Sequence, residues 1–183
     1  MNEKHLLFWD IDGVLRDLYS SVFGDEPDDW NKKINNLGLV EYVSQNKDIL
    51  LNAKTDKYYN VLIKTKELSN IENVILSCQP SDWINFTKNW LKNHNLDDMK
   101  VEFVQTAEEK LKKLEKELFN KKWLSVYLID DYPFDFSNDE IFRFFVLLID
   151  KKYNKSTNTY YRIKSPKELE EFISIINKVK FKF

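Results

Sequence analysis

The sequence HLLFWDIDGVLRD, residues 5–17, contains the strongest fold signal in the chain. A short apolar run ends abruptly in two carboxylates, Asp10 and Asp12, and Gly13 follows directly. Side chains two positions apart on an extended strand share a face, and glycine allows the backbone to turn sharply after them. Because two acids at the end of a buried strand are costly without compensation, the stretch predicts a strand that delivers acidic side chains to a site.

The apolar run at residues 6–9 is followed by four others along the chain. They cover residues 74–76, 101–104, 126–129 and 144–149. Continuous rather than alternating apolar runs are typical of strands buried on both faces, as in a parallel sheet covered by helices. Helical patterns separate the runs. We therefore predict an α/β fold, a Rossmann-like three-layer open parallel sheet.

Two of the predicted helices have recognisable starts. Ser165 is placed to cap one of them, with Pro166 at the first helical position and Glu168 at the capping-box position. Thr106 and Glu109 have the same capping-box spacing at the start of another. Each start is followed by apolar residues at helical spacing, which predicts one buried face per helix.

The segment of residues 17–70 is longer than a simple crossover between two strands requires. We predict that it forms a small, mainly helical cap over the end of the first strand. The α/β core then comprises residues 1–16 and 71–183.

Composition excludes several classes of site. The chain has 183 residues, of which 43% are hydrophobic, enough for one domain with a real core. One cysteine and two histidines exclude an intrachain disulfide and a cysteine- or histidine-rich zinc site. Three glycines are too few for the dinucleotide fingerprint, and no P-loop can be written.

The charge and hydropathy pattern also limits the partners. The net charge is −2, so we expect no global basic field, and nucleic acid is not the favoured partner. No apolar stretch approaches the ~18 residues of a membrane span, and the opening apolar run is too short for a signal peptide. We expect a cytoplasmic protein that does not bind a membrane. The sequence leaves the oligomeric state open.

Polar residues after the predicted strands should meet at one edge of the sheet, because open α/β sheets bind ligands beyond the carboxyl ends of their strands. Asp10 and Asp12 follow the first strand, Ser77 the second, and Asp130 and Asp131 the fourth. Carboxylates ~4 Å apart repel by several kcal/mol at a protein surface, so the group requires a cation. All ligands offered are oxygen, which favours Mg²⁺ over zinc or copper.

The helix after Thr106 is rich in lysine, and one of its lysines differs from the rest. The apolar stripe of this helix comprises Ala107, Leu111, Leu114 and Leu118. At about 100° per residue, Lys110 lies roughly 70° from the centre of the stripe, whereas Lys112, Lys113 and Lys116 lie roughly 130° or more from it. Lys110 therefore borders the buried face near the expected site, and we predict that it is the lysine that belongs to the site.

The motifs occur in the order DIDGVLRD (10–17), LSCQP (76–80), a lysine on a helix and VYLIDDYP (126–133). This order resembles the haloacid dehalogenase-like (HAD) phosphohydrolase superfamily, and the likeness covers the chain except the insertion and the final helix. The resemblance implies a Mg²⁺-dependent phosphatase that hydrolyses a phosphomonoester.

The resemblance also implies a role for each matched residue. Asp10 would be the nucleophile that forms an aspartyl-phosphate, and Asp12 the general acid and later the base. Mg²⁺ would bind Asp10, the main-chain carbonyl of Asp12 and Asp131, with Asp130 holding a metal-bound water. Ser77 and Lys110 would contact the phosphoryl group.

A narrower similarity points to the small 5′(3′)-deoxyribonucleotidases of this superfamily. It is carried by LSCQPSDWINFTKNWLKNHN (76–95), in which Lys88 and Trp90 match a family pair, and by LIDDYP (128–133). It implies a nucleotide monophosphate as substrate and cap aromatics that contact it; the available ones are Tyr19, Phe23, Trp30, Tyr58 and Tyr59. Arg16 departs from the small or apolar residue expected before Asp17, which leaves substrate preference open.

Two alternatives remain open. An enzyme that removes phosphate from nucleic-acid ends would need an open cleft and a basic track. A HAD-like binding or signalling module would use the acidic site without turnover. A response-regulator receiver also combines acids, a hydroxyl and a lysine, but its phosphorylated aspartate follows a middle strand, where this sequence has Ser77.

Overall fold

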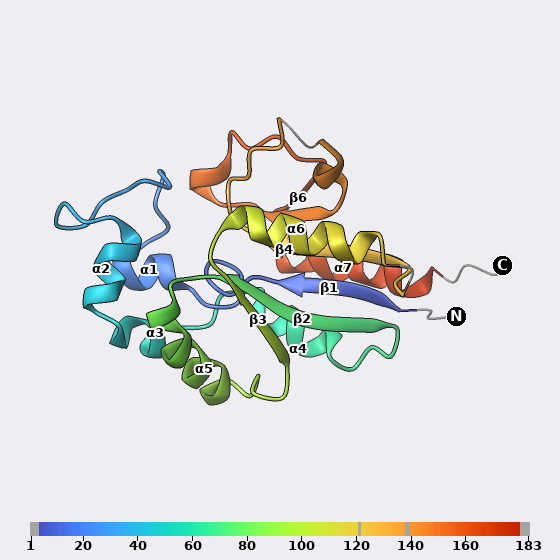
Figure 1. Ribbon diagram of the computed structural model, residues 1–183, viewed down its shortest axis with the longest axis horizontal. Helices are drawn as coiled ribbons and strands as arrows, with labels where there is room; N and C mark the ends of the chain where they lie inside the picture. Colours follow the sequence, from blue (N-terminus) through green and yellow to red (C-terminus); the bar gives the residue numbers. More distant parts are fainter. Residues whose placement is uncertain (1–3, 121, 138–139, 180–183) are drawn as a thin grey trace.

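The computed structural model describes residues 4–120, 122–137 and 140–179 (Figure 1). Its six strands form one sheet in the order β3-β2-β1-β4-β5-β6, and every neighbouring pair is parallel. The strands are β1 (His5–Trp9), β2 (Ile71–Cys78), β3 (Lys100–Val104), β4 (Ser125–Asp130), β5 (Val146–Ile149) and β6 (Tyr161–Ile163). The predicted α/β open parallel sheet is confirmed.

Helices cover both faces of the sheet. On one face, Leu7 and Trp9 of β1 share a buried core with residues of α4 (Tyr59–Thr65), α5 (Ile84–Asn93) and α7 (Pro166–Lys178). On the other, Leu6 and Phe8 share a core with α6 (Ala107–Leu118) and with phenylalanines of the segment after β4. Neighbouring residues of β1 therefore serve opposite layers, as alternation along a strand requires.

Helices α6 and α7 begin at the predicted caps. The Thr106 side chain accepts a hydrogen bond from the backbone N–H of Glu109, and Ser165 accepts one from that of Glu168. Each glutamate carboxylate bonds in return to the backbone N–H of the residue before the cap. These bonds satisfy N–H groups that the first helical turn leaves without a partner.

The segment of residues 17–70 contains four short helices. Three of them, α1 (Leu18–Phe23), α2 (Leu39–Gln45) and α3 (Asp48–Asn52), lie beyond the carboxyl end of β1 (Figure 1) and share a small core with Trp83. The fourth, α4, places Val61 and Leu62 in the core of the sheet. The division into core and cap stays a prediction, and α4 is the part of this segment that packs on the sheet.

The strand boundaries differ from the predicted apolar runs at several ends; β5, for example, begins at Val146 rather than at residue 144, which lies in a 3₁₀ turn. β2 begins at Ile71, three positions before the apolar run, and β6 was not predicted because only three residues pair there. Three 3₁₀ turns complete the described structure: η1 (Ser81–Trp83), η2 (Glu140–Phe144) and η3 (Lys152–Asn154). Within the described ranges, no helix has the length and apolar character needed to cross a bilayer.

Candidate active site

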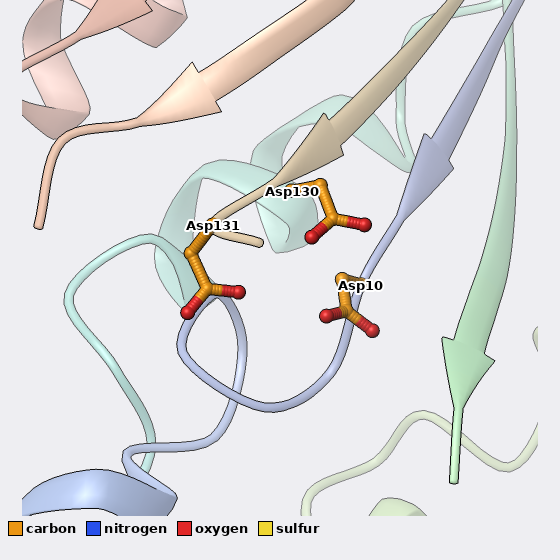
Figure 2. A group of neighbouring side chains, drawn as sticks. All are labelled: Asp10, Asp130 and Asp131. Carbon is orange, nitrogen blue, oxygen red and sulfur yellow. The ribbon is translucent and has the colours of Figure 1, made fainter. Parts of the chain in front are cut away.

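Three buried carboxylates meet at the carboxyl end of the sheet (Figure 2). Asp10 directly follows β1, Asp130 ends β4 and Asp131 follows it, and one carboxylate oxygen from each lies within 4.8 Å of the others. The register explains this arrangement, because Trp9 pairs with Ile129 and so brings the next residue of each strand alongside the other. We call Asp10, Asp130 and Asp131 the acid cluster.

Lys110 contacts the acid cluster from α6. Its Nζ atom lies 2.9 Å from Oδ1 of Asp10 and 2.7 Å from Oδ2 of Asp130, and the residue is only 2% exposed. Lys113, on the same helix, instead pairs with Glu102 and is partly exposed. The structure thus brings together the lysine that the angular argument selected and two of the predicted acids.

The electrostatics of the acid cluster reflect burial and excess negative charge. Burial, reinforced by the charge of Asp130 and opposed by Lys110, raises the pKa of Asp10 to about 7. Burial together with the charges of Asp10 and Asp130 raises the pKa of Asp131 well above its usual value. Burial alone would lower the pKa of Lys110, but the two neighbouring carboxylates outweigh it and raise that pKa. One lysine does not balance the charge of three carboxylates, so a bound cation would stabilise the acid cluster.

The remaining contacts of Asp130 and Asp131 hold them in place. Oδ1 of Asp130 accepts a hydrogen bond of 2.9 Å from the backbone N–H of Tyr132. Oδ2 of Asp131 accepts one from the hydroxyl of Tyr153, a buried residue of η3. Asn154 donates its side-chain amide to the main-chain carbonyl of Asp131 at 2.8 Å. The turn after β5 therefore supports the acids that follow β4.

Gly13 lies directly against the carboxylate of Asp131. Its φ of +83° lies in the left-handed region, and a Cβ atom built there would overlap Oδ2 of Asp131. Both the turn and the space therefore require glycine at this position.

The acid cluster fits a divalent cation that prefers oxygen. Its donors are all carboxylates, and Oδ1 of Asp10 is buried without a well-directed hydrogen bond among the described residues. Mg²⁺ is bound in proteins through one or two carboxylates together with waters and substrate phosphate. The residues present therefore suit Mg²⁺, with Asp10 and Asp131 as the carboxylates nearest the open space.

Asp12 stands apart from the acid cluster and pairs with Arg16. Nε of Arg16 lies 2.7 Å from Oδ1 of Asp12, and Nη2 lies 3.0 Å from Oδ2. The prediction that Asp10 and Asp12 share a face of one extended strand was wrong. β1 ends at Trp9, and Asp12 lies in the turn that follows. Asp12 nevertheless lines the same cavity as Asp10.

The structure does not bring Ser77 to the acid cluster. Ile75 packs in the same core as Trp9, so Ser77, two positions further on, has its side chain on that face, whereas Asp10 is on the other. Ser77 is buried, with 1% of the residue exposed, and its hydroxyl accepts a hydrogen bond from Gln79. Cys78 lines the cavity instead, and burial raises the pKa of its thiol to about 11.

A cavity of about 390 Å³ opens above Asp10 and Lys110. One part of its lining is polar, with Asp12 and Asp131 beside these two residues. The rest is largely aromatic and aliphatic, and comprises Leu18, Tyr19, Trp30, Leu39, Val40, Pro80, Trp83 and Tyr132 among others. A cavity of this size with a few converging polar groups has the character of a small-molecule site.

Of the five aromatic residues predicted to contact a ligand, Tyr19 and Trp30 line this cavity. Phe23 packs against the small core of α1–α3. Tyr58 and Tyr59 are not in the lining; their hydroxyls donate to the carbonyls of Ile163 and His94.

The two residues matched to the deoxyribonucleotidase pair lie outside the cavity lining. Lys88 is exposed on α5. Trp90 is fully buried, and its Nε1 donates a hydrogen bond of 2.7 Å to the carbonyl of Ala53. Trp90 therefore has a structural role in joining α5 to the segment before α4.

Comparisons with known proteins add little to this geometry. No protein-family model matches the chain, and no curated protein does. Two solved structures that resemble it are described as "Structure of Pnkp1/Rnl/Hen1 complex" and "Structure of the Pnkp1/Rnl/Hen1 RNA repair complex", both at 15% identity and a TM-score of 0.42. The similar regions cover 69% and 70% of this chain but 39% and 36% of those chains, so it spans well under half of their length.

Sequence reasoning missed three residues around the site. Tyr153 follows β5 in a turn without a recognisable motif. Cys78 follows Ser77 by one position, which exchanges the faces of the sheet and places it in the cavity lining. Arg16 was noted as unusual, but its pairing with Asp12 was not predicted; the spacing of four residues between an acid and an arginine was the available signal.

Proposed function

We propose that this chain is a Mg²⁺-dependent phosphomonoesterase in which Asp10 is the nucleophile. The observation that carries the proposal is the convergence of Asp10, Lys110, Asp130 and Asp131 below a cavity of about 390 Å³. The order of these residues along the chain, which resembles that of the HAD phosphohydrolases, gives the arrangement its chemical interpretation.

The reaction proceeds in two displacements. A carboxylate oxygen of Asp10 attacks phosphorus, the bond to the leaving oxygen breaks, and Asp12 gives that oxygen a proton. Water then attacks the aspartyl-phosphate, Asp12 takes a proton from the water, and inorganic phosphate leaves with the carboxylate of Asp10 restored. Lys110 orients Asp10 and counters the negative charge that spreads over the phosphoryl oxygens.

Asp10 and Asp131 would hold Mg²⁺, together with the main-chain carbonyl of Asp12, and Asp130 would act through a water. When bound, the ion neutralises the carboxylates and the phosphate so that the two can approach. Lys110 and the backbone N–H of Tyr132 meanwhile keep both oxygens of Asp130 engaged.

We propose a nucleoside monophosphate as the substrate. The support for it is the lining of the cavity, where Tyr19, Trp30 and Tyr132 form an aromatic wall beside the acids. Trp30 and Tyr132 lie edge to face, with ring centroids 5.1 Å apart. Aromatic rings at this position can stack on a base while the phosphate reaches Asp10.

The test is hydrolysis by the wild type and by Asp10→Asn. The panel comprises p-nitrophenyl phosphate, nucleoside and deoxynucleoside monophosphates and 3′-phosphorylated oligonucleotides, each with Mg²⁺ and with EDTA. We expect Mg²⁺-dependent turnover by the wild type and none by Asp10→Asn. Asp97→Asn, in the exposed turn before β3, is the matched control and should be fully active.

Three results would change the proposal. Activity that survives in Asp10→Asn contradicts the nucleophile assignment. Turnover of oligonucleotide ends but not of mononucleotides indicates an enzyme that acts on nucleic-acid ends. A wild type that binds phosphate analogues without hydrolysing any member of the panel indicates a binding module.

A further inference from the structure

Arg16 is a fully buried cation beside the proposed site. Its side chain has no exposed surface, and it makes two parallel contacts with Asp12, one from Nε at 2.7 Å and one from Nη2 at 3.0 Å. A planar guanidinium that meets a carboxylate through two contacts fixes the plane of that carboxylate as well as its position. Asp12 needs such support, since it lies in a turn beyond the end of β1.

The rest of the guanidinium is attached to two helices. Nη1 donates a hydrogen bond of 2.9 Å to the carbonyl of Leu50 in α3, and Nη2 donates one of 3.2 Å to the hydroxyl of Thr87 in α5. The guanidinium also lies over the ring of Trp90, 5.4 Å from its centroid. Arg16 is therefore held from outside the turn that carries Asp12.

A buried chain of hydrogen bonds continues from Thr87 to the end of β2. The Thr87 hydroxyl donates to Oε1 of Gln79 at 2.7 Å, and Nε2 of Gln79 donates to the hydroxyl of Ser77 at 2.9 Å. All three residues of this chain are buried, and the Thr87 hydroxyl and the Gln79 amide each donate to the next member. Such a network restrains its members to one arrangement. It also accounts for the burial of Ser77, which the cavity does not explain.

We infer that Arg16 is a positioning residue that aims the Asp12 carboxylate into the cavity, supported by Leu50 and by the buried chain from Thr87 to Ser77. The inference rests on the proposed function, because it needs Asp12 to transfer a proton during phosphate hydrolysis. Arg16 itself touches no substrate, since it does not line the cavity. Its effect on the rate passes entirely through Asp12.

The test is a double-mutant cycle between Arg16→Met and Asp12→Asn, measured as kcat and KM. General acid–base catalysis contributes about 10²–10⁴-fold, so we expect Arg16→Met to lower kcat at least ~10-fold, with KM changed less than about 3-fold. In the Asp12→Asn background, Arg16→Met should cause no further loss, because its route of action is already removed. An equal factor in both backgrounds overturns the inference, because Arg16 would then affect the rate by a route that does not involve Asp12.

Arg143→Met is the matched control. Arg143 bonds to Asn158 and does not line the cavity, so kcat should be unchanged in both backgrounds. Thermal unfolding of every variant checks folding.

A second variant keeps the test decisive if Arg16→Met does not fold. Thr87→Val removes one anchor of the guanidinium and leaves both contacts with Asp12. We expect a loss of roughly 2- to 5-fold in kcat that disappears in the Asp12→Asn background. A loss that persists there contradicts the inference. If Asp10→Asn is inert and the cycle is additive, only this inference fails; a wild type without phosphatase activity overturns the proposed function and the inference with it.

Discussion

The Nζ atom of Lys110 lies 2.9 Å from Oδ1 of Asp10 and 2.7 Å from Oδ2 of Asp130, below a cavity that α6 helps to line. One buried ammonium therefore bridges the acid that follows β1 and the acid that ends β4. Removing a member of a buried ion pair is costly, because the remaining charges keep no partner. The contacts of Lys110 should therefore affect both the stability of the fold and the proposed catalysis.

We expect Lys110→Met to lower both the stability of the folded protein and the rate of hydrolysis. The free energy of unfolding should fall by about 3 kcal/mol in urea titrations. The kcat for phosphomonoester hydrolysis should fall by about 10²–10³-fold, because the charge on the phosphoryl oxygens loses its counterpart. Lys113→Met is the control: its ammonium pairs with Glu102 on the partly exposed side of α6, so both quantities should change little. Equal effects of the two variants would contradict the assignment of Lys110.

Mg²⁺ should stabilise the folded protein. At a concentration of 100 times Kd, one bound ion adds about 2.7 kcal/mol to the free energy of unfolding, provided that it binds only the folded state. Thermal unfolding with Mg²⁺ and with EDTA measures the difference. In Asp131→Asn, which removes one charge from the acid cluster, the Mg²⁺-dependent shift should shrink to a small fraction. If Mg²⁺ raises the unfolding temperature of that variant as much as that of the wild type, the ion binds at another site.

Two glycines with the same backbone angle allow the crowding at Asp131 to be measured. Gly13 and Gly24 both have φ of +83°, but only the Cβ of Gly13→Ala would overlap Asp131, whereas nothing lies within 4 Å at Gly24. Gly24→Ala should cost about 1 kcal/mol of stability from backbone strain alone. Gly13→Ala should cost more in urea titrations and should also weaken Mg²⁺ binding. Equal costs would show that Asp131 moves aside freely.

The aromatic wall predicts a selective effect on large substrates. Trp30→Ala should raise KM for nucleoside monophosphates by about 10-fold, since stacking of a base on an aromatic ring contributes roughly 1–3 kcal/mol. KM for glycerol phosphate, which has no ring to stack, should stay within about 2-fold by the same argument. Phe23→Ala, a loss of comparable aromatic surface outside the cavity lining, is the control. A uniform rise for all substrates would indicate a general disturbance of α1–α3.

Much of the fold follows from local pattern. The apolar runs mark β1 to β5 because strands buried on both faces need continuous apolar sequence. The caps at Thr106 and Ser165 mark α6 and α7 because side-chain acceptors there satisfy free N–H groups. β6 has three residues, too few to form a pattern, and its pairing with β5 is decided by tertiary packing.

The candidate site was predictable where helix or strand periodicity fixes the direction of a side chain. The angle of Lys110 relative to the apolar stripe of α6 placed it correctly beside Asp10 and Asp130. The prediction for Ser77 failed because the sequence does not reveal which face of the sheet each side chain occupies at the end of a strand. A shift of one residue along β2 moves every side chain to the opposite face. Tyr153 could not be found at all, because it reaches Asp131 from a turn after another strand.

The central place of β1 has a consequence for synthesis on the ribosome. β1 is made before β2 and β3, whereas its neighbour β4 begins only at Ser125. An emerging chain can pair β1 with β2, and β2 with β3, while Asp10 has no acidic neighbour from β4. Mutual repulsion between Asp10 and the acids of β4 therefore arises only once β4 has been translated, so the apolar pairing of the earlier strands can form before that electrostatic cost appears.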